Sequence, residues 1–118
     1  MGGGIILNNQ VVKGSHMAAG ELSCCLINRD VEGISMDNVI AMRFAVPGLL
    51  KMYRDKTGAE ETLDGVEFFR RANEGEEAAL ETLRYFCRVT ATYFYDLQVI
   101  LDVDCIAVGG GISAQTLL

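Results

Sequence analysis

A stripe of mainly apolar side chains in the second half of the chain limits what this sequence can fold into. The stripe recurs at steps of three and four, at Leu80, Leu83, Phe86, Thr90, Phe94, Leu97 and Leu101. This spacing places the side chains on one face of a helix of about six or seven turns. Such a face is core packing by default, so we expect other parts of the chain to pack against it.

The first part of the chain predicts a hairpin, a loop and a strand. Two short β-type runs, residues 5–7 and 10–12, flank an Asn-Asn pair. Asparagine tolerates the left-handed backbone that two-residue hairpin turns require. Residues 14–20 are typical of a loop, and the apolar run at 22–27 predicts a buried strand.

Two shorter helices are predicted in the middle of the chain. One begins at Pro47, because proline suits the first helical turn, and Gly58 is its expected end. The other begins at Asp64, because Asp64 and Glu67 have the spacing of a capping box. Gly75 is expected to close that second helix.

A glycine cluster near the C-terminus has the pattern of a phosphate- or nucleotide-binding turn. A predicted strand at 105–108 is followed by Gly109, Gly110 and Gly111, and then by Ser113 as a helix N-cap. A strand, a glycine turn and a helix start present backbone N–H groups to a ligand. The same glycines also allow a helix to pack close to a strand, and the sequence leaves both interpretations open.

A second cluster, Gly2, Gly3 and Gly4, directly precedes the hairpin. It is either a flexible leader or the end of a glycine-rich phosphate loop.

Composition excludes several classes of function. The net charge of −6, from ten basic and sixteen acidic residues, argues against a nucleic-acid-binding surface. No apolar run approaches the ~20 residues needed to span a bilayer, so no membrane role is expected. The four cysteines, Cys24, Cys25, Cys87 and Cys105, have neither disulfide-framework nor metal-knuckle spacing. They are interpreted as free thiols in a reducing cytoplasm.

Three segments, taken in order, resemble one family. Residues 2–8 read Gly-Gly-Gly-Ile-Ile-Leu-Asn, Ala19-Gly20-Glu21 follows Gly14, and residues 108–113 read Val-Gly-Gly-Gly-Ile-Ser. They resemble the phosphate-loop end, the sugar site and the adenosine-side glycine turn of the ROK family (repressor, open reading frame, kinase). The resemblance covers most of the chain. It implies an α/β fold over residues 1–118, the C-terminal lobe of an actin-like ROK sugar kinase, with the N-terminal lobe absent.

The resemblance also implies the site residues. Glu21 would accept hydrogen bonds from sugar hydroxyls, and the two glycine clusters would contact ATP. The family carries a histidine three residues after this glutamate, which touches both sugar and zinc. Cys24 stands at that position and is a predicted substrate contact. Residues 28–46 contain no cysteine, so the family's zinc ligands are missing and we predict no zinc. His16 is expected to be a surface loop residue.

The implied function is part of an ATP-dependent kinase of a hexose or N-acetylhexosamine, with ATP and Mg²⁺ serving the intact parent. The family's N-terminal Asp-x-Gly-Gly-Thr loop and catalytic Asn-Asp pair are missing. The chain is therefore expected to be an incomplete piece that is not active alone. The alternative is the sugar-sensing part of a ROK transcriptional regulator, or a non-catalytic remnant. A homo-oligomer is expected, because loss of a lobe exposes apolar surface.

Overall fold

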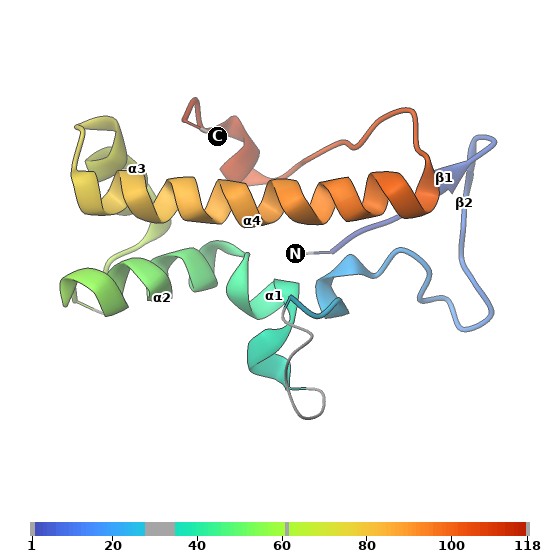
Figure 1. The fold of residues 1–118 in the computed structure, drawn as a ribbon, viewed down its shortest axis with the longest axis horizontal. Helices are drawn as coiled ribbons and strands as arrows, with labels where there is room; N and C mark the ends of the chain where they lie inside the picture. The colour runs from blue at the N-terminus through green and yellow to red at the C-terminus, as the bar shows by residue number, and fades with distance from the viewer. Residues whose placement is uncertain (1, 28–34, 61, 118) are drawn as a thin grey trace. The chain divides into compact units, whose positions relative to one another are not determined.

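The computed structural model describes residues 2–27, 35–60 and 62–117. The chain divides into two compact units, Met1–Gly48 and Leu49–Leu118. The first unit contains the hairpin strands and three short helical turns of Figure 1, namely β1 (Ile6–Leu7), β2 (Gln10–Val11), η1 (Leu22–Cys24), η2 (Met36–Asn38) and α1 (Ile40–Arg43). The second unit contains most of α2 (Val46–Thr57), then α3 (Gly65–Asn73), α4 (Glu77–Leu101) and η3 (Gly111–Ala114).

The predicted hairpin is confirmed. Strand β1 pairs antiparallel with β2, with Leu7 opposite Gln10. Asn8 and Asn9 form the turn with φ values of 51° and 60°. Two successive left-handed residues match the twist of the flanking strands, which explains why an Asn-Asn pair stands here.

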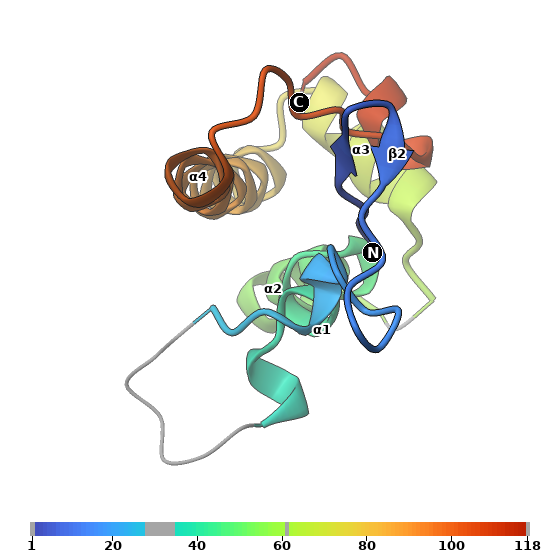
Figure 2. The same ribbon diagram turned by 90° about the vertical axis from the view of Figure 1, so that its right-hand side faces the viewer.

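The prediction of a strand at residues 22–27 is wrong. The chain instead forms the turn η1, and Leu26 makes a single antiparallel bridge with Val39. The cause is local, because the Glu21 side chain accepts a hydrogen bond from the backbone N–H of Ser23 and so favours a helical turn over a ladder. Figure 2 shows η1 beside α1, whose Ile40 N–H donates to the carbonyl of Cys25.

The two middle helices form where the sequence predicts them. Helix α2 contains Pro47 in its first turn, and the Gly58 N–H, at a φ of 69°, closes it on the carbonyl of Arg54 at 2.8 Å. At the start of α3, Asp64 Oδ1 accepts the Glu67 N–H at 2.9 Å, which is one half of the predicted capping box. The Glu67 carboxylate bonds forward to Arg70 and Arg71 instead of completing the box.

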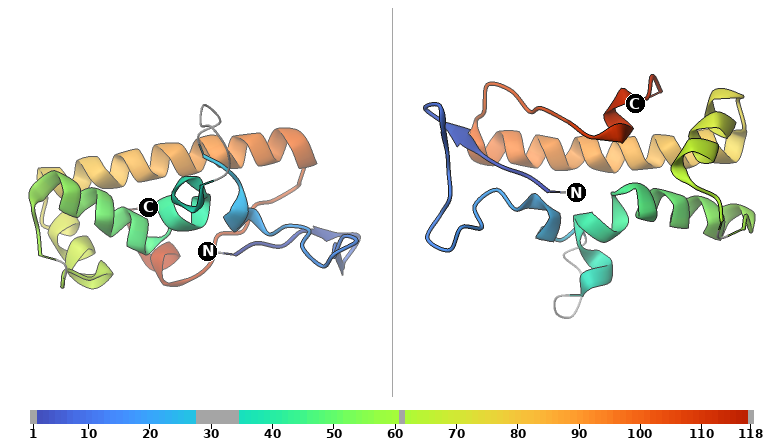
Figure 3. Two further views of the ribbon diagram at one scale, coloured as in Figure 1. Left: turned by 90° about the horizontal axis from the view of Figure 1, so that it is seen from below. Right: turned by 180° about the vertical axis from the view of Figure 1, so that it is seen from behind.

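The long helix is confirmed as α4, and its predicted stripe faces the core of the second unit at Leu83, Phe86 and Leu97. Helix α3 packs against it, and the right-hand view of Figure 3 shows α3 across the first turns of α4. Asp102, in a left-handed conformation, ends the helix by donating its N–H to Gln98. Within the described ranges, no helix combines the length and apolarity that crossing a bilayer requires.

The segment after α4 corrects two further expectations. Residues 105–108 form neither a helix nor a strand and pair with no described strand, since β1 and β2 pair with each other. A strand needs a hydrogen-bonded neighbour, and none of the described residues supplies one. The helix predicted from Ser113 is the single turn η3, which Gly110 caps, and Ser113 lies inside it with its hydroxyl donating to the Gly110 carbonyl at 2.8 Å.

Candidate functional site

The first unit brings two of the predicted motifs into direct contact. A β-carbon added to Gly3 would lie 2.5 Å from the carbonyl oxygen of Gly20 and 2.8 Å from Cγ of Leu22. A β-carbon added to Gly20 would lie 2.9 Å from Cα of Gly4, and Gly20 has a φ of 81°. Only glycine fits both positions without movement. The residue 2–4 cluster therefore packs directly on the turn that carries Glu21.

Gly2 and Gly4 differ from Gly3 in this respect. A β-carbon at either residue would meet no described atom within 4 Å. Packing within the described residues explains glycine at position 3, but it does not explain glycine at positions 2 and 4. The open space at these two positions lies where a side chain would point, while the Gly4 backbone itself packs on Gly20.

Glu21 is exposed at the beginning of η1 and is held from one side. Its Oε1 accepts the Ser23 hydroxyl at 2.5 Å and the Ser23 N–H at 3.3 Å. The hydroxyl bond, and then the backbone bond, lowers the pKa of the Glu21 carboxyl below its ordinary value. Both bonds favour the charged form, so Glu21 is an ionised acceptor at neutral pH.

Ser23 is the site residue that the sequence analysis missed. A serine two residues after an acid, at the start of a turn, is a signal for a local side-chain-to-backbone motif. The apolar neighbours Leu22 and Leu26 led instead to a strand prediction. Cys24, the other predicted sugar contact, is exposed, and its Sγ lies 3.8 Å from Ser23 Oγ.

The other glycine cluster belongs to the second unit. Gly109, Gly110 and Gly111 are exposed, and a β-carbon at any of them would meet no described atom within 4 Å. Gly110 has a φ of 95°, which requires glycine for the turn itself. The interpretation of these glycines as a close contact between helix and strand therefore has no support among the described residues.

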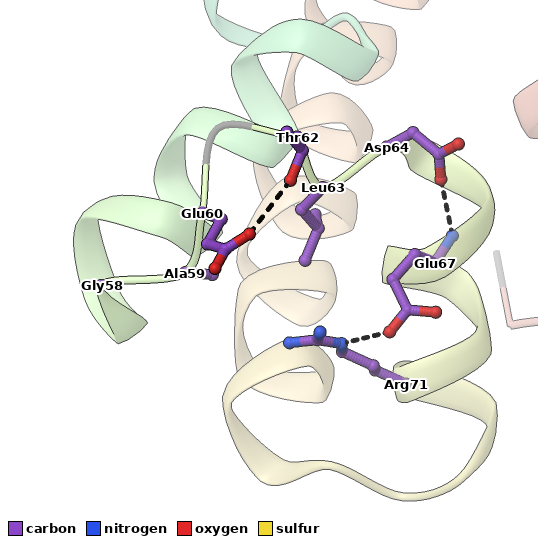
Figure 4. Close-up of a pocket in the computed structure, with 8 residues that line it drawn as sticks. All are labelled: Gly58, Ala59, Glu60, Thr62, Leu63, Asp64, Glu67 and Arg71. Atoms are coloured by element: carbon purple, nitrogen blue, oxygen red, sulfur yellow. Dashed lines mark hydrogen bonds and ion pairs between the residues drawn. The ribbon is translucent and has the colours of Figure 1, made fainter.

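A hollow of about 560 Å³ also lies in the second unit, between the end of α2 and α3 (Figure 4). Its polar groups are already paired, since Arg71 Nε donates to Glu67 Oε1 at 2.7 Å and Asp64 caps α3. It is lined by Gly58, Ala59, Glu60, Thr62, Leu63, Asp64, Glu67 and Arg71. The predicted site residues are not among them.

Metal-ligating side chains do not gather around the cysteines in the described part of the chain, where no group of three or more His, Cys, Asp or Glu could hold an ion. All four cysteines are free thiols. Burial raises the pKa of the Cys87 thiol, which keeps it protonated. His16 is exposed in the loop, as the sequence predicts.

Comparison with known proteins identifies the family that the sequence resembles. The profile of the ROK family matches residues 1–118. An N-acetyl-D-glucosamine kinase from Vibrio atlanticus (strain LGP32) is 30% identical over 122 residues, which cover 95% of this chain and 40% of that protein. A solved structure from Listeria monocytogenes, of a protein proposed to be an N-acetylmannosamine kinase, has a TM-score of 0.84 at 25% identity and covers 97% of this chain.

A ROK family protein from Streptococcus pneumoniae TIGR4, solved in complex with sucrose, has a TM-score of 0.82 at 23% identity and covers 98% of this chain. The chain spans about two fifths of the length of these relatives, 40%, 40% and 38% respectively. The predicted fold class, part of a ROK fold, is confirmed by these similarities.

Proposed function

This chain belongs to the ROK family, and from that premise we propose that it is the C-terminal lobe of an ATP-dependent kinase of hexoses or N-acetylhexosamines. The named relatives support the substrate class, since one is an N-acetyl-D-glucosamine kinase and another is a proposed N-acetylmannosamine kinase. In this proposal the chain supplies sugar- and nucleotide-binding elements, and the remaining part of the fold supplies the catalytic base.

The contact between Gly3 and Gly20 carries the proposal. It packs the turn that carries an exposed, ionised carboxylate against the glycine backbone of residues 3 and 4. A carboxylate accepts directional hydrogen bonds from vicinal hydroxyls, and open backbone N–H groups suit phosphate. Phosphoryl transfer needs these two ligands side by side, because its catalysis depends on positioning and on charge stabilisation.

Each predicted residue has a separate task in this proposal. Glu21 orients the sugar, and Cys24 contacts it at the position where the family carries a histidine. Gly2 and Gly4 approach the phosphates, with Gly3 supporting the loop. The residue 109–111 turn contacts the adenosine.

Magnesium would accompany the nucleotide. Mg²⁺ is usually held by one or two carboxylates together with substrate phosphates, so a protein cage is not required. In this proposal the ion would be held mainly by the nucleotide phosphates, and none of the described residues is assigned to it. The ion would neutralise charge on the transferring phosphoryl group.

The sugar site can be tested on this chain by NMR. Addition of N-acetylglucosamine or N-acetylmannosamine at millimolar concentration should shift the backbone amides of Gly20, Glu21 and Ser23. Glu21→Gln removes the charged acceptor and should abolish these shifts. Glu60→Gln, a change at an exposed carboxylate of the second unit, is the matched control. Identical shifts in the wild type and in Glu21→Gln would contradict the assignment of Glu21 to the sugar.

Cys24 favours a second candidate function. A thiol lacks the two-sided hydrogen bonding of a histidine, so sugar orientation at this position is weaker than in the family pattern. A ROK transcriptional regulator needs only to sense a sugar, which tolerates this loss. An assay of ADP release by the whole protein separates the two, because a regulator binds sugar without turnover.

We also propose that the protein is a homo-oligomer of the reducing cytoplasm. Tyr95, Val99 and Ile100 are 69%, 65% and 72% exposed on the last turns of α4. Apolar patches of this kind are typically covered by a partner. Light scattering at micromolar concentration should give a mass of at least two chains, and Ile100→Lys should lower it. A monomeric wild type would contradict the proposal. The four free thiols fit a reducing compartment.

A further inference from the structure

Ser23 connects the two residues that the sequence assigns to the sugar. Its Oγ lies 2.5 Å from Glu21 Oε1 on one side and 3.8 Å from Cys24 Sγ on the other. Ser23 is half-buried, whereas both of its partners are exposed. The serine thus lies behind the pair and leaves their outer faces free.

The protons in this group can be assigned from chemistry. An ionised carboxylate only accepts, so the single hydroxyl proton of Ser23 is donated to Glu21. The Ser23 oxygen keeps its lone pairs and accepts the thiol proton of Cys24. The order of donation is therefore Cys24 S–H to Ser23 Oγ, and Ser23 O–H to Glu21 Oε1. The charge is carried by Glu21.

The two carboxylate oxygens of Glu21 differ in their hydrogen bonds. Oε1 accepts both the hydroxyl and the backbone N–H of Ser23. No hydrogen bond to Oε2 is found among the described residues, and the side chain is exposed. A side chain that is already fixed loses less conformational freedom when a ligand binds.

We propose that Ser23 is a positioning residue, which holds Glu21 through Oε1 so that Oε2 is presented to a sugar hydroxyl. The inference rests on the proposed sugar site, and it adds a residue on which the orientation of the carboxylate depends. The lowered pKa of the Glu21 carboxyl agrees with this arrangement, because the Ser23 hydroxyl is its largest cause.

The first test measures the hydrogen bond without any sugar. The Glu21 carboxyl carbon is followed by NMR as a function of pH in the full 118-residue chain. Ser23→Ala should raise the pKa of Glu21 towards its ordinary value, and Ser23→Thr, which keeps the hydroxyl, should leave it lowered. Ser15→Ala, in the preceding exposed loop, is the control. An unchanged pKa in Ser23→Ala would overturn the inference.

The second test measures its consequence for binding. The affinity for N-acetylglucosamine should fall about three- to tenfold in Ser23→Ala, as expected for the loss of one hydrogen bond, and Ser23→Thr should restore it. Equal or tighter binding by Ser23→Ala would overturn the inference, since Ser23 would then be competing with the sugar. If Glu21→Gln also leaves binding unchanged, the proposed sugar site fails; if Glu21→Gln weakens binding and Ser23→Ala does not, only the role of Ser23 fails.

Discussion

The carbonyl oxygen of Gly20 lies only 2.5 Å from the position that a β-carbon on Gly3 would take, which is too close for a side chain. These two glycines are distant in sequence, yet the Gly20 carbonyl excludes a side chain at Gly3, and the backbone of Gly4 and Ile5 excludes one at Gly20. The same Gly20 carbonyl accepts the Leu22 N–H at 2.8 Å, which begins the turn carrying Glu21 and Ser23. The shape of the candidate sugar site therefore depends on a contact made by backbone alone.

Gly3→Ala should destabilise the first unit by about 1–3 kcal/mol, the usual cost of overpacking a tight contact. Gly4→Ala is the matched control, because its β-carbon would meet open space, and it should change stability by less than about 0.5 kcal/mol. Amide hydrogen exchange at Leu22 and Cys25 reports on this unit directly. Equal protection in both variants would show that the contact is not tight in solution.

Phe68→Ala should destabilise the second unit by about 3–5 kcal/mol, the typical cost of removing a fully buried aromatic ring. Phe68 is completely buried and makes edge-to-face contacts with Tyr53 and Phe69, both at 5.3 Å between ring centroids. Val66 on the same helix is 80% exposed, so Val66→Ala should cost less than about 0.5 kcal/mol. Urea unfolding followed by circular dichroism measures both. If Phe68→Ala does not fold, Phe68→Leu should show a smaller loss of the same sign.

Acid should weaken α3 through Glu67. Hydrogen bonds from Arg70, and then from Arg71, lower the pKa of Glu67 from 4.5 to about 2. A pKa lowered in the folded state gives stability that is complete above about pH 4.5 and is lost as the pH falls through 2. Urea midpoints between pH 7 and pH 2 should therefore fall more steeply for the wild type than for Glu67→Gln.

Glu77→Gln serves as the control for this pH series. The side chain of Glu77 is 70% exposed and pairs with Arg84 at 3.0 Å, so solvent screens its ion pair. Its pH profile should run parallel to that of the wild type. Parallel profiles for Glu67→Gln as well would mean that the Glu67 pairs do not persist in solution.

Elements governed by local chemistry could be predicted from the sequence. The Asn8-Asn9 turn, the Asp64 cap and the stop at Gly58 each depend on a conformational preference of one or two residues. The stripe along α4 is long enough for its period to be unambiguous. These elements formed within a few residues of their predicted positions.

The failed predictions concern short apolar runs, whose structure depends on their neighbours. Residues 22–27 and 105–108 have the composition of strands, but a strand forms only when another strand pairs with it. In the first run the Glu21–Ser23 hydrogen bonds favour a turn instead. The contact between Gly3 and Gly20 was likewise invisible, because glycine spacing alone does not show which backbones approach each other.

Purified without chelator, the protein should contain no stoichiometric zinc. Structural zinc normally requires four ligands, and Cys24 and Cys25 supply two. Elemental analysis of the full chain is the measurement. One zinc per chain would show that these cysteines form a site with further ligands.

The chain alone should not phosphorylate any sugar. Transfer to a hydroxyl needs a base that takes its proton, and the sequence contains no Asn-Asp pair of the kind that supplies this base in the family. Glu21 cannot replace it, because its lowered pKa makes it a weak base and Ser23 already occupies one of its oxygens. The measurement is a coupled ADP-release assay with ATP, magnesium, hexoses and N-acetylhexosamines. Turnover above background that disappears in Glu21→Ala would contradict this prediction, since a site containing Glu21 would then be catalytically complete.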